Sequence, residues 1–201
     1  MGHITAFESV TLDGVMQGLG RADEDTRGGF THGGWGEGFA DEVSMQFAME
    51  GMGEEGALLF GRRTYDDILG YWSGIGQDNP FTGYLLGTQK YVASRSHAPA
   101  THPNTQILVG EAVVTVAKLK AETDLPLTVL GSGELIRSLH AAGLVDTLTL
   151  QIHPTLLGSG TRLFGQGDRT DMRLRRSLAT TTGVVIAEYD VRHRTNQEAQ
   201  A

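Results

Sequence analysis

The chain has 201 residues, a length that suits one domain with a substantial core. Hydrophobic residues make up 39% and charged residues 20%, as in globular domains, and no apolar run approaches the roughly 18 residues needed to cross a bilayer. The net charge of −8 argues against a general nucleic-acid binder, and the absence of cysteine excludes disulfides, thiolate metal ligands and cysteine nucleophiles. The N-terminus lacks a basic leader and an apolar signal core, so we expect a cytoplasmic protein without a membrane partner.

Short apolar runs and helical periodicities alternate through the first two thirds of the chain. Strands are predicted over residues 3–10, 57–60, 91–93, 107–109 and 127–130. Helices are predicted over residues 39–52, 62–72 and 112–122, and from Leu135 to a C-terminal glycine cap near Gly143. Between the first strand and the first helix lies a long glycine-rich stretch, Thr11–Gly38, and a loop of this length in a compact domain is usually functional or partly disordered. Its part Gly18–Gly38 is unusually rich in glycine and charge.

The pattern changes after residue 143, where alternating strands dominate. The segments VDTLTLQIH and GVVIAEYDV alternate strongly, and Gly183 reads as the turn of a hairpin. We therefore predict a single α/β domain: a mixed, mostly parallel sheet with antiparallel C-terminal strands and helices on its faces. Its core spans about residues 3–192, and the polar tail, residues 193–201, is expected to fray.

Three polar turns that directly follow predicted strands are suited to anions. These turns are Gly61-Arg62-Arg63-Thr64, Ser94-Arg95-Ser96 and Gly131-Ser132-Gly133, the last followed by a helix that begins with Glu134. Glycines let the backbone approach a phosphate, a helix N-terminus offers free N–H groups, and arginine can bind two phosphate oxygens. Because the carboxyl ends of parallel strands share one edge of a sheet, three such turns suggest a dinucleotide site.

Each turn also has an interpretation without a ligand. Arg62 or Arg63 could pair with Asp66 or Asp67 along the helix, and Ser-Arg-Ser is common in polar turns. Gly131–Gly133 could be only a tight strand–helix turn. The sequence has isoleucine where a Rossmann fingerprint requires its third glycine, and the Glu134 carboxylate would repel a phosphate on its own side of the helix.

Other candidate sites are weaker. Asp13-Gly14 is a turn signal after the first strand, although Asp13 and the backbone from Val10 to Met16 could also lie beside a cofactor's reactive end. No histidine spacing indicates a metal site, and His153 at a strand end is more often structural than catalytic. The second Gly-Ser-Gly, Gly158–Gly160, has no helix behind it and is expected to be architectural.

Taken together, SVTLDG, LLFGRRTYDD and VLGSGELIRSLHAAGLVDTLTLQIHPTLLGSGTRLF resemble the reductase domain of riboflavin biosynthesis and its stand-alone bacterial relatives. This family, RibD C-terminal-domain-like, shares the dihydrofolate reductase fold, and the resemblance runs from about residue 3 to 192. It implies a three-layer sandwich, NADPH as cofactor and, often, a homodimer. The zinc deaminase that is often joined to this reductase requires cysteine ligands, which this chain lacks.

The resemblance also implies roles for individual residues. The cofactor's phosphates would lie against Gly61, Arg62, Arg63 and Thr64, and the adenosine 2′-phosphate against Ser94, Arg95 and Ser96. The pyrophosphate would lie at Leu130, Gly131, Ser132 and Gly133, with Glu134 at the helix start. Asp13, Val10 and Met16 would lie near the nicotinamide and the reducible substrate, and the catalytic proton would come from water or from an acid such as Asp13. No metal is implied.

Two functions remain open from the sequence. The first is an NADPH-dependent oxidoreductase that reduces a C=N or C=O bond of a small substrate, resembling 5-amino-6-(5-phosphoribosylamino)uracil reductase or dihydrofolate reductase. The second is a non-catalytic NADP(H)- or nucleotide-binding protein, such as a sensor. Asp13 is the feature that separates them here, because a binding protein has no need of a carboxylate beside the nicotinamide.

Overall fold

The computed structural model describes residues 1–76, 79–165, 167 and 169–192. The expected polar tail, residues 193–201, lies outside them. The strands are β1 (Ile4–Thr11), β2 (Ala57–Gly61), β3 (Lys90–Ser94), β4 (Thr105–Val109), β5 (Leu127–Leu130), β6 (Thr147–His153), β7 (Met172–Ala179) and β8 (Val185–Val191). The helices are α1 (Glu42–Gly53), α2 (Arg62–Ile75), α3 (Pro80–Gly87), α4 (Ala112–Glu122) and α5 (Gly133–Ala141), with a short 3-10 helix at Arg27–Gly29.

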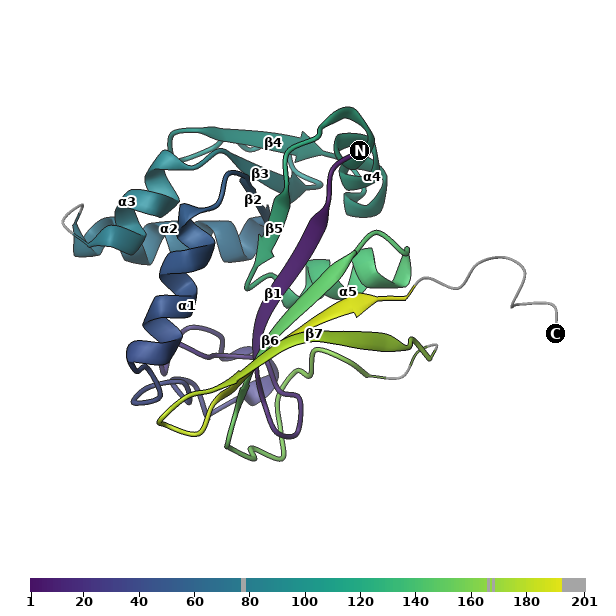
Figure 1. Ribbon diagram of the computed structural model, residues 1–201. Helices are drawn as coiled ribbons and strands as arrows, with labels where there is room; N and C mark the ends of the chain where they lie inside the picture. The colour runs from purple at the N-terminus through teal and green to yellow at the C-terminus, as the bar shows by residue number, and fades with distance from the viewer. Residues whose placement is uncertain (77–78, 166, 168, 193–201) are drawn as a thin grey trace, which may run out of the picture.

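The strands form one mixed sheet in the order β4-β3-β2-β5-β1-β6-β8-β7. The first six are parallel to one another, whereas β8 runs antiparallel to β6 and β7 antiparallel to β8. Helices α1, α2 and α3 gather on one side of the sheet and α4 and α5 on the other, giving three layers (Figure 1). The predicted fold class and the Gly183 hairpin, where φ is +88°, are confirmed.

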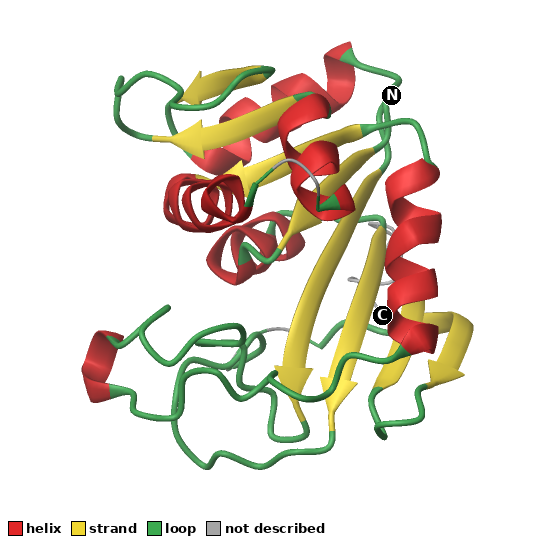
Figure 2. Ribbon diagram, turned by 90° about the vertical axis from the view of Figure 1, so that its left-hand side faces the viewer, coloured by secondary structure: helices red, strands yellow, loops and turns green. Residues whose placement is uncertain are grey.

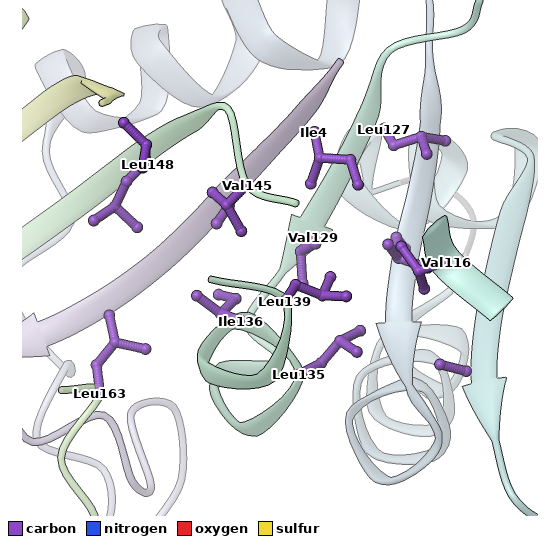
Figure 3. Packing of buried hydrophobic residues seen from close by; sticks show 14 of the residues in the cluster. Ile4, Val116, Leu127, Val129, Leu135, Ile136, Leu139, Val145, Leu148 and Leu163 are labelled. Carbon is purple, nitrogen blue, oxygen red and sulfur yellow. The ribbon is translucent and has the colours of Figure 1, made fainter. Parts of the chain in front are cut away.

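Each face of the sheet buries its own apolar cluster. On the α5 face, Ile4, Leu127 and Val129 of the central strands pack with Ile136 and Leu139 of the helix, as Figure 3 shows. On the opposite face, residues of β2 and β3 pack against α2 and α3, around a fully buried Tyr65. Burial of both faces explains why the strands are short continuous apolar runs in the sequence.

The sequence prediction missed one helix and shifted several boundaries. Helix α3 was not predicted because PFTGYLLG is apolar throughout and has no helical stripe; Asn79 starts it by accepting hydrogen bonds from the N–H groups of Phe81 and Thr82. Helix α1 begins at Glu42 rather than at residue 39, because the Asp41 side chain caps it in a reciprocal pair of hydrogen bonds with Ser44.

The Gly18–Gly38 loop is ordered around a small apolar cluster of its own, formed by Val15, Phe30 and Trp35. Trp35 donates a 2.7 Å hydrogen bond from Nε1 to the carbonyl of Gln17. The loops, green in Figure 2, gather at the end of the sheet to which the long central strands point. The loop therefore stands over the carboxyl edge of the parallel strands.

The Gln17 side chain joins this loop to the segment that precedes β7. Its Nε2 donates to the carbonyls of Asp25 and Arg27 at 3.1 and 3.0 Å, and its Oε1 accepts from the N–H and the hydroxyl of Thr161 at 2.9 and 3.0 Å. The amide thus uses both of its ends, and two segments far apart in the sequence are fixed to each other.

The described part of the chain contains neither a helix suited to span a membrane nor a cluster of side chains suited to bind a metal ion. None of its helices is both long and apolar enough to span a membrane. None of its clusters brings together three or more His, Asp or Glu side chains in an arrangement that could hold a metal ion.

Candidate functional site

A cavity of about 1010 Å³ lies at the carboxyl edge of the parallel strands, and the three predicted turns all line it. The turns follow β3, β2 and β5, which are consecutive in the sheet, with β1 next in the row. The volume is at the upper end of the usual range for one drug-sized ligand, so the cavity is large enough for an extended cofactor. Every predicted cofactor residue except Val10 lines it.

The two arginines of the turn after β2 differ in their contacts. The Arg62 guanidinium donates to Asp66 at 2.7 Å and to the carbonyls of Ala98 and Pro99, so it holds α2 to a neighbouring loop. The Arg63 guanidinium forms no hydrogen bond or ion pair with any residue that the structure describes. The intrahelical alternative therefore applies to Arg62, whereas Arg63 keeps its charge available at the start of a helix, where a bound anion is favourable.

The turn after β3 is built by its own hydroxyls. Ser94 Oγ accepts a hydrogen bond from the N–H of Ser96 at 3.1 Å and donates one to the carbonyl of Ser96 at 3.2 Å. Ser96 Oγ accepts a hydrogen bond from the N–H of Ala98. Arg95 is exposed, and its guanidinium likewise has no partner among the described residues. Three hydrogen bonds hold the turn, and it presents a cation without a partner among the described residues to the cavity, which suits a phosphate monoester.

The turn after β5 is locked to the turn after β2. Gly131 has a φ of +63°, in the left-handed region that favours glycine, and Ser132 Oγ accepts a 3.0 Å hydrogen bond from the N–H of Gly61. Helix α5 then begins at Gly133, and no side chain caps it. Glu134 pairs with Arg137 at 2.5 Å on its own helix. Its charge is thereby partly compensated, and the uncapped helix start remains suited to a phosphate.

Asp13 lies outside the cavity. Its carboxylate accepts hydrogen bonds from the Thr11 hydroxyl at 2.6 Å and from the N–H groups of Leu157 and Gly158 at 3.2 and 2.8 Å. Arg162 adds a 2.8 Å bond to the Asp13 carbonyl. The Thr11 hydroxyl and the two N–H groups hold the pKa of Asp13 at about 2. The structure thus does not bring Asp13 together with the cavity residues, and these contacts favour a structural role.

The second glycine tripeptide is part of the same arrangement. Gly158 is bound by Asp13, and Gly160 has a φ of +107° and lies against Phe30 and Val15, where a Cβ would be only 2.6 and 2.8 Å from their side chains. It therefore packs beneath the Gly18–Gly38 loop, in agreement with an architectural role. Val10 is buried in the core of the sheet rather than in the cavity wall.

Glu8 is the cavity residue that the sequence reasoning missed. It lies on β1, where it is only 5% exposed, and its Oε2 has no hydrogen-bond partner among the residues that the structure describes. Burial, reinforced by the negative charge of Glu24, raises the pKa of Glu8 to about 8, although a hydrogen bond from the Ser9 N–H acts in the opposite direction. Residues 4, 6, 8 and 10 share one buried face of the strand, so a carboxyl among apolar residues was the available signal.

Comparison with solved structures supports the fold. A putative riboflavin biosynthesis protein from Shewanella sp. PV-4 superimposes with a TM-score of 0.66 at 19% identity, covering 95% of this chain and 99% of that one. A pyrimidine reductase-like protein from Corynebacterium diphtheriae gives 0.62 at 12% identity, covering 96% and 93%. A Thermotoga maritima deaminase/5-amino-6-(5-phosphoribosylamino)uracil reductase gives 0.63 at 13% identity, covering 94% of this chain and 56% of that longer one.

Sequence comparison identifies the family. The uncharacterized protein YyaP of Bacillus subtilis is 28% identical over 192 residues, which cover 90% of each chain. The family described as RibD C-terminal domain matches residues 2–186. This match spans the sheet from β1 into β8 and includes all three turns of the cavity. The chain therefore belongs to the RibD C-terminal domain family.

Proposed function

We propose that the protein is an NADPH-dependent reductase that converts a C=N or C=O bond of a small substrate. The observation that carries this proposal is the row of three anion-suited turns along one cavity, with two cations, Arg63 and Arg95, that have no partner in the described part of the chain. The reductase named in the Thermotoga maritima relative supports the same reaction class.

From the sheet order, we infer an arrangement of the turns along an extended dinucleotide. Ser94–Ser96 at the end of β3 would hold the adenosine 2′-phosphate, and the Gly131–Gly133 turn at β5 would hold the pyrophosphate with the help of Arg63. The nicotinamide end would then lie toward β1, beside Met16 and Glu8. NADPH would supply the hydride, while the protein's residues bind, orient and protonate.

The alternative is a nucleotide-binding protein without turnover. The position of Asp13 outside the cavity favours it, because the carboxylate expected beside the nicotinamide is occupied elsewhere. Glu8, however, lines the cavity, so a carboxyl group is available there to donate a proton, and this favours the reductase.

The cofactor assignment is tested by fluorescence titration with NADPH and NADH. Arg95→Ala should weaken NADPH binding by about 10- to 100-fold, because a charge-assisted hydrogen bond contributes about 1.5–3 kcal/mol, and should leave NADH binding nearly unchanged. Arg169→Ala is the matched control, since Arg169 is an exposed arginine that pairs with Asp171 and does not line the cavity.

Two results would count against the proposal. Equal affinity of the wild type for NADH and NADPH would contradict the 2′-phosphate site at Ser94–Ser96. Tight NADPH binding without oxidation across pterins, ribosylamino-pyrimidines and simple carbonyl compounds would favour the non-catalytic alternative.

A further inference from the structure

We propose that Glu8 is the acid that protonates the substrate when it is reduced, an inference that rests on the reductase function proposed above. Glu8 lines the cavity, is 5% exposed, and has an oxygen, Oε2, that finds no hydrogen-bond partner in the described part of the chain. Such an orphaned buried oxygen costs free energy, so it calls for a ligand or a functional role.

The position of Glu8 fits the reactive end of the cofactor. Adjacent strands lie about 4.8 Å apart, so β1 is roughly 14 Å from β3, which carries the proposed 2′-phosphate turn. A Cβ placed on Gly133 would lie 3.1 Å from Glu8 Oε2 and 1.9 Å from Met16 Sδ. The carboxyl thus lies immediately beyond the pyrophosphate turn, in the direction in which the nicotinamide would extend.

The surroundings of Glu8 keep it protonated. The charged groups of the loop and of the start of α5 that line the cavity with Glu8 are Arg21, Glu24, Asp25, Arg27 and Glu134. Arg21 is bound to Asp67 and Arg27 to Asp25, so neither arginine of the loop forms an ion pair with Glu8. Burial and Glu24 raise the pKa of Glu8 to about 8, and at neutral pH the group is therefore mostly a carboxylic acid.

The proposed step balances without any further reactant. The substrate carbon accepts hydride from NADPH and forms a C–H bond, while the π electron pair of C=N or C=O moves to the nitrogen or oxygen. That atom takes the proton from the Glu8 carboxyl as the O–H bond breaks. The products are an amine or alcohol, NADP⁺ and the Glu8 carboxylate, which regains its proton from water. Asp13, with a pKa of about 2, has no proton to give at neutral pH.

The protonation state is tested first, without cofactor or turnover. Difference infrared spectra of wild type minus Glu8→Gln should show the C=O stretch of a protonated carboxylic acid at pH 6 and 7, and the band should disappear as the pH rises through about 8. Glu122→Gln, an exposed residue of α4 outside the cavity, is the matched control and should leave this band in place. Absence of the band from the wild type at neutral pH would overturn the proposal.

Single-turnover oxidation of NADPH tests the chemical role. Glu8→Gln should lower the rate constant by about 100- to 1000-fold and abolish the wild-type decline above about pH 8, while NADPH affinity changes by less than about twofold. Glu8→Asp should keep the pH dependence at a reduced rate, and it replaces Glu8→Gln if thermal unfolding shows that the glutamine variant does not fold.

The outcomes separate this proposal from the one on which it rests. If the wild type oxidises NADPH and Glu8→Gln does so equally fast with the same pH profile, Glu8 is not the acid but the reductase stands. If the wild type binds NADPH but none of the tested substrates causes its oxidation, both proposals fail.

Discussion

Replacing Asp13 distinguishes a structural carboxylate from a catalytic one. Asp13→Ala removes the acceptor for the Thr11 hydroxyl and for the N–H groups of Leu157 and Gly158. Hydrogen bonds to a charged group contribute about 1.5–3 kcal/mol each and are not additive, so the variant should lose about 2–4 kcal/mol of unfolding free energy. For a domain of this size, that corresponds to a fall in melting temperature of about 5–15 °C.

The measurement is thermal unfolding followed by circular dichroism, combined with NADPH titration. NADPH affinity should stay within about twofold of wild type, because Asp13 does not line the cavity. Asp23→Ala is the matched control, since the Asp23 side chain is 90% exposed and outside the cavity, and it should melt close to wild type. A variant Asp13→Ala that melts at the wild-type temperature but no longer oxidises NADPH would refute this reasoning.

The pH dependence of the same effect has a definite sign. Because the folded-state pKa of Asp13 is about 2 and its ordinary value is 3.8, the unfolded chain takes up the proton first as the pH falls. The stability that Asp13 contributes is therefore complete above about pH 4 and is lost as the pH falls toward 2. The difference in unfolding free energy between wild type and Asp13→Asn should shrink over this interval.

Two further predictions concern the Gly18–Gly38 loop. Gly33→Ala would place a Cβ 2.5 Å from the carbonyl oxygen of Ala22, a backbone atom that cannot rotate away. Urea unfolding should therefore show a loss of about 1–3 kcal/mol in unfolding free energy. Gly51→Ala, in open space on α1, is the control and should be neutral or stabilising. His153 is buried against Trp35 with no partner for either ring nitrogen, and burial lowers its pKa below 6.5. Its stabilising contribution is therefore present above about pH 6.5 and lost as the pH falls below this value. His153→Phe should flatten the fall of unfolding free energy below about pH 6.5, and equal slopes in the two proteins would contradict this.

The elements that the sequence predicted well are those with a strong local signal. The strand over 127–130 and the helix over 112–122 are confirmed at both ends, because each has a continuous apolar or helical pattern with clear boundaries. The three anion-suited turns also reach one cavity, as the rule for parallel strands requires.

The contacts of Asp13 and Glu8 show what local patterns cannot predict. Asp13 has the stronger local signal, an Asp-Gly turn after a strand, but its partners are residues 157 and 158, which local sequence does not bring near it. Glu8 looks like an ordinary polar strand residue until the sheet shows that its face is buried by α5. Tertiary contacts determine whether each of these two carboxyl groups is hydrogen-bonded or desolvated. They thereby determine its pKa.

The Gln17 amide has a consequence for how the cavity opens. Because the two ends of the amide bind the Asp25–Arg27 turn and Thr161, the loop cannot lift away from the segment before β7 unless both hydrogen bonds at one end of the amide break together. Opening is then a cooperative event, not gradual fraying from the loop tip. The amide protons of Gly34 and Gly36, which are bonded to the carbonyls of Gly18 and Leu19, should exchange with solvent with one shared opening free energy. Access to the buried acid of β1 would be set by that single equilibrium.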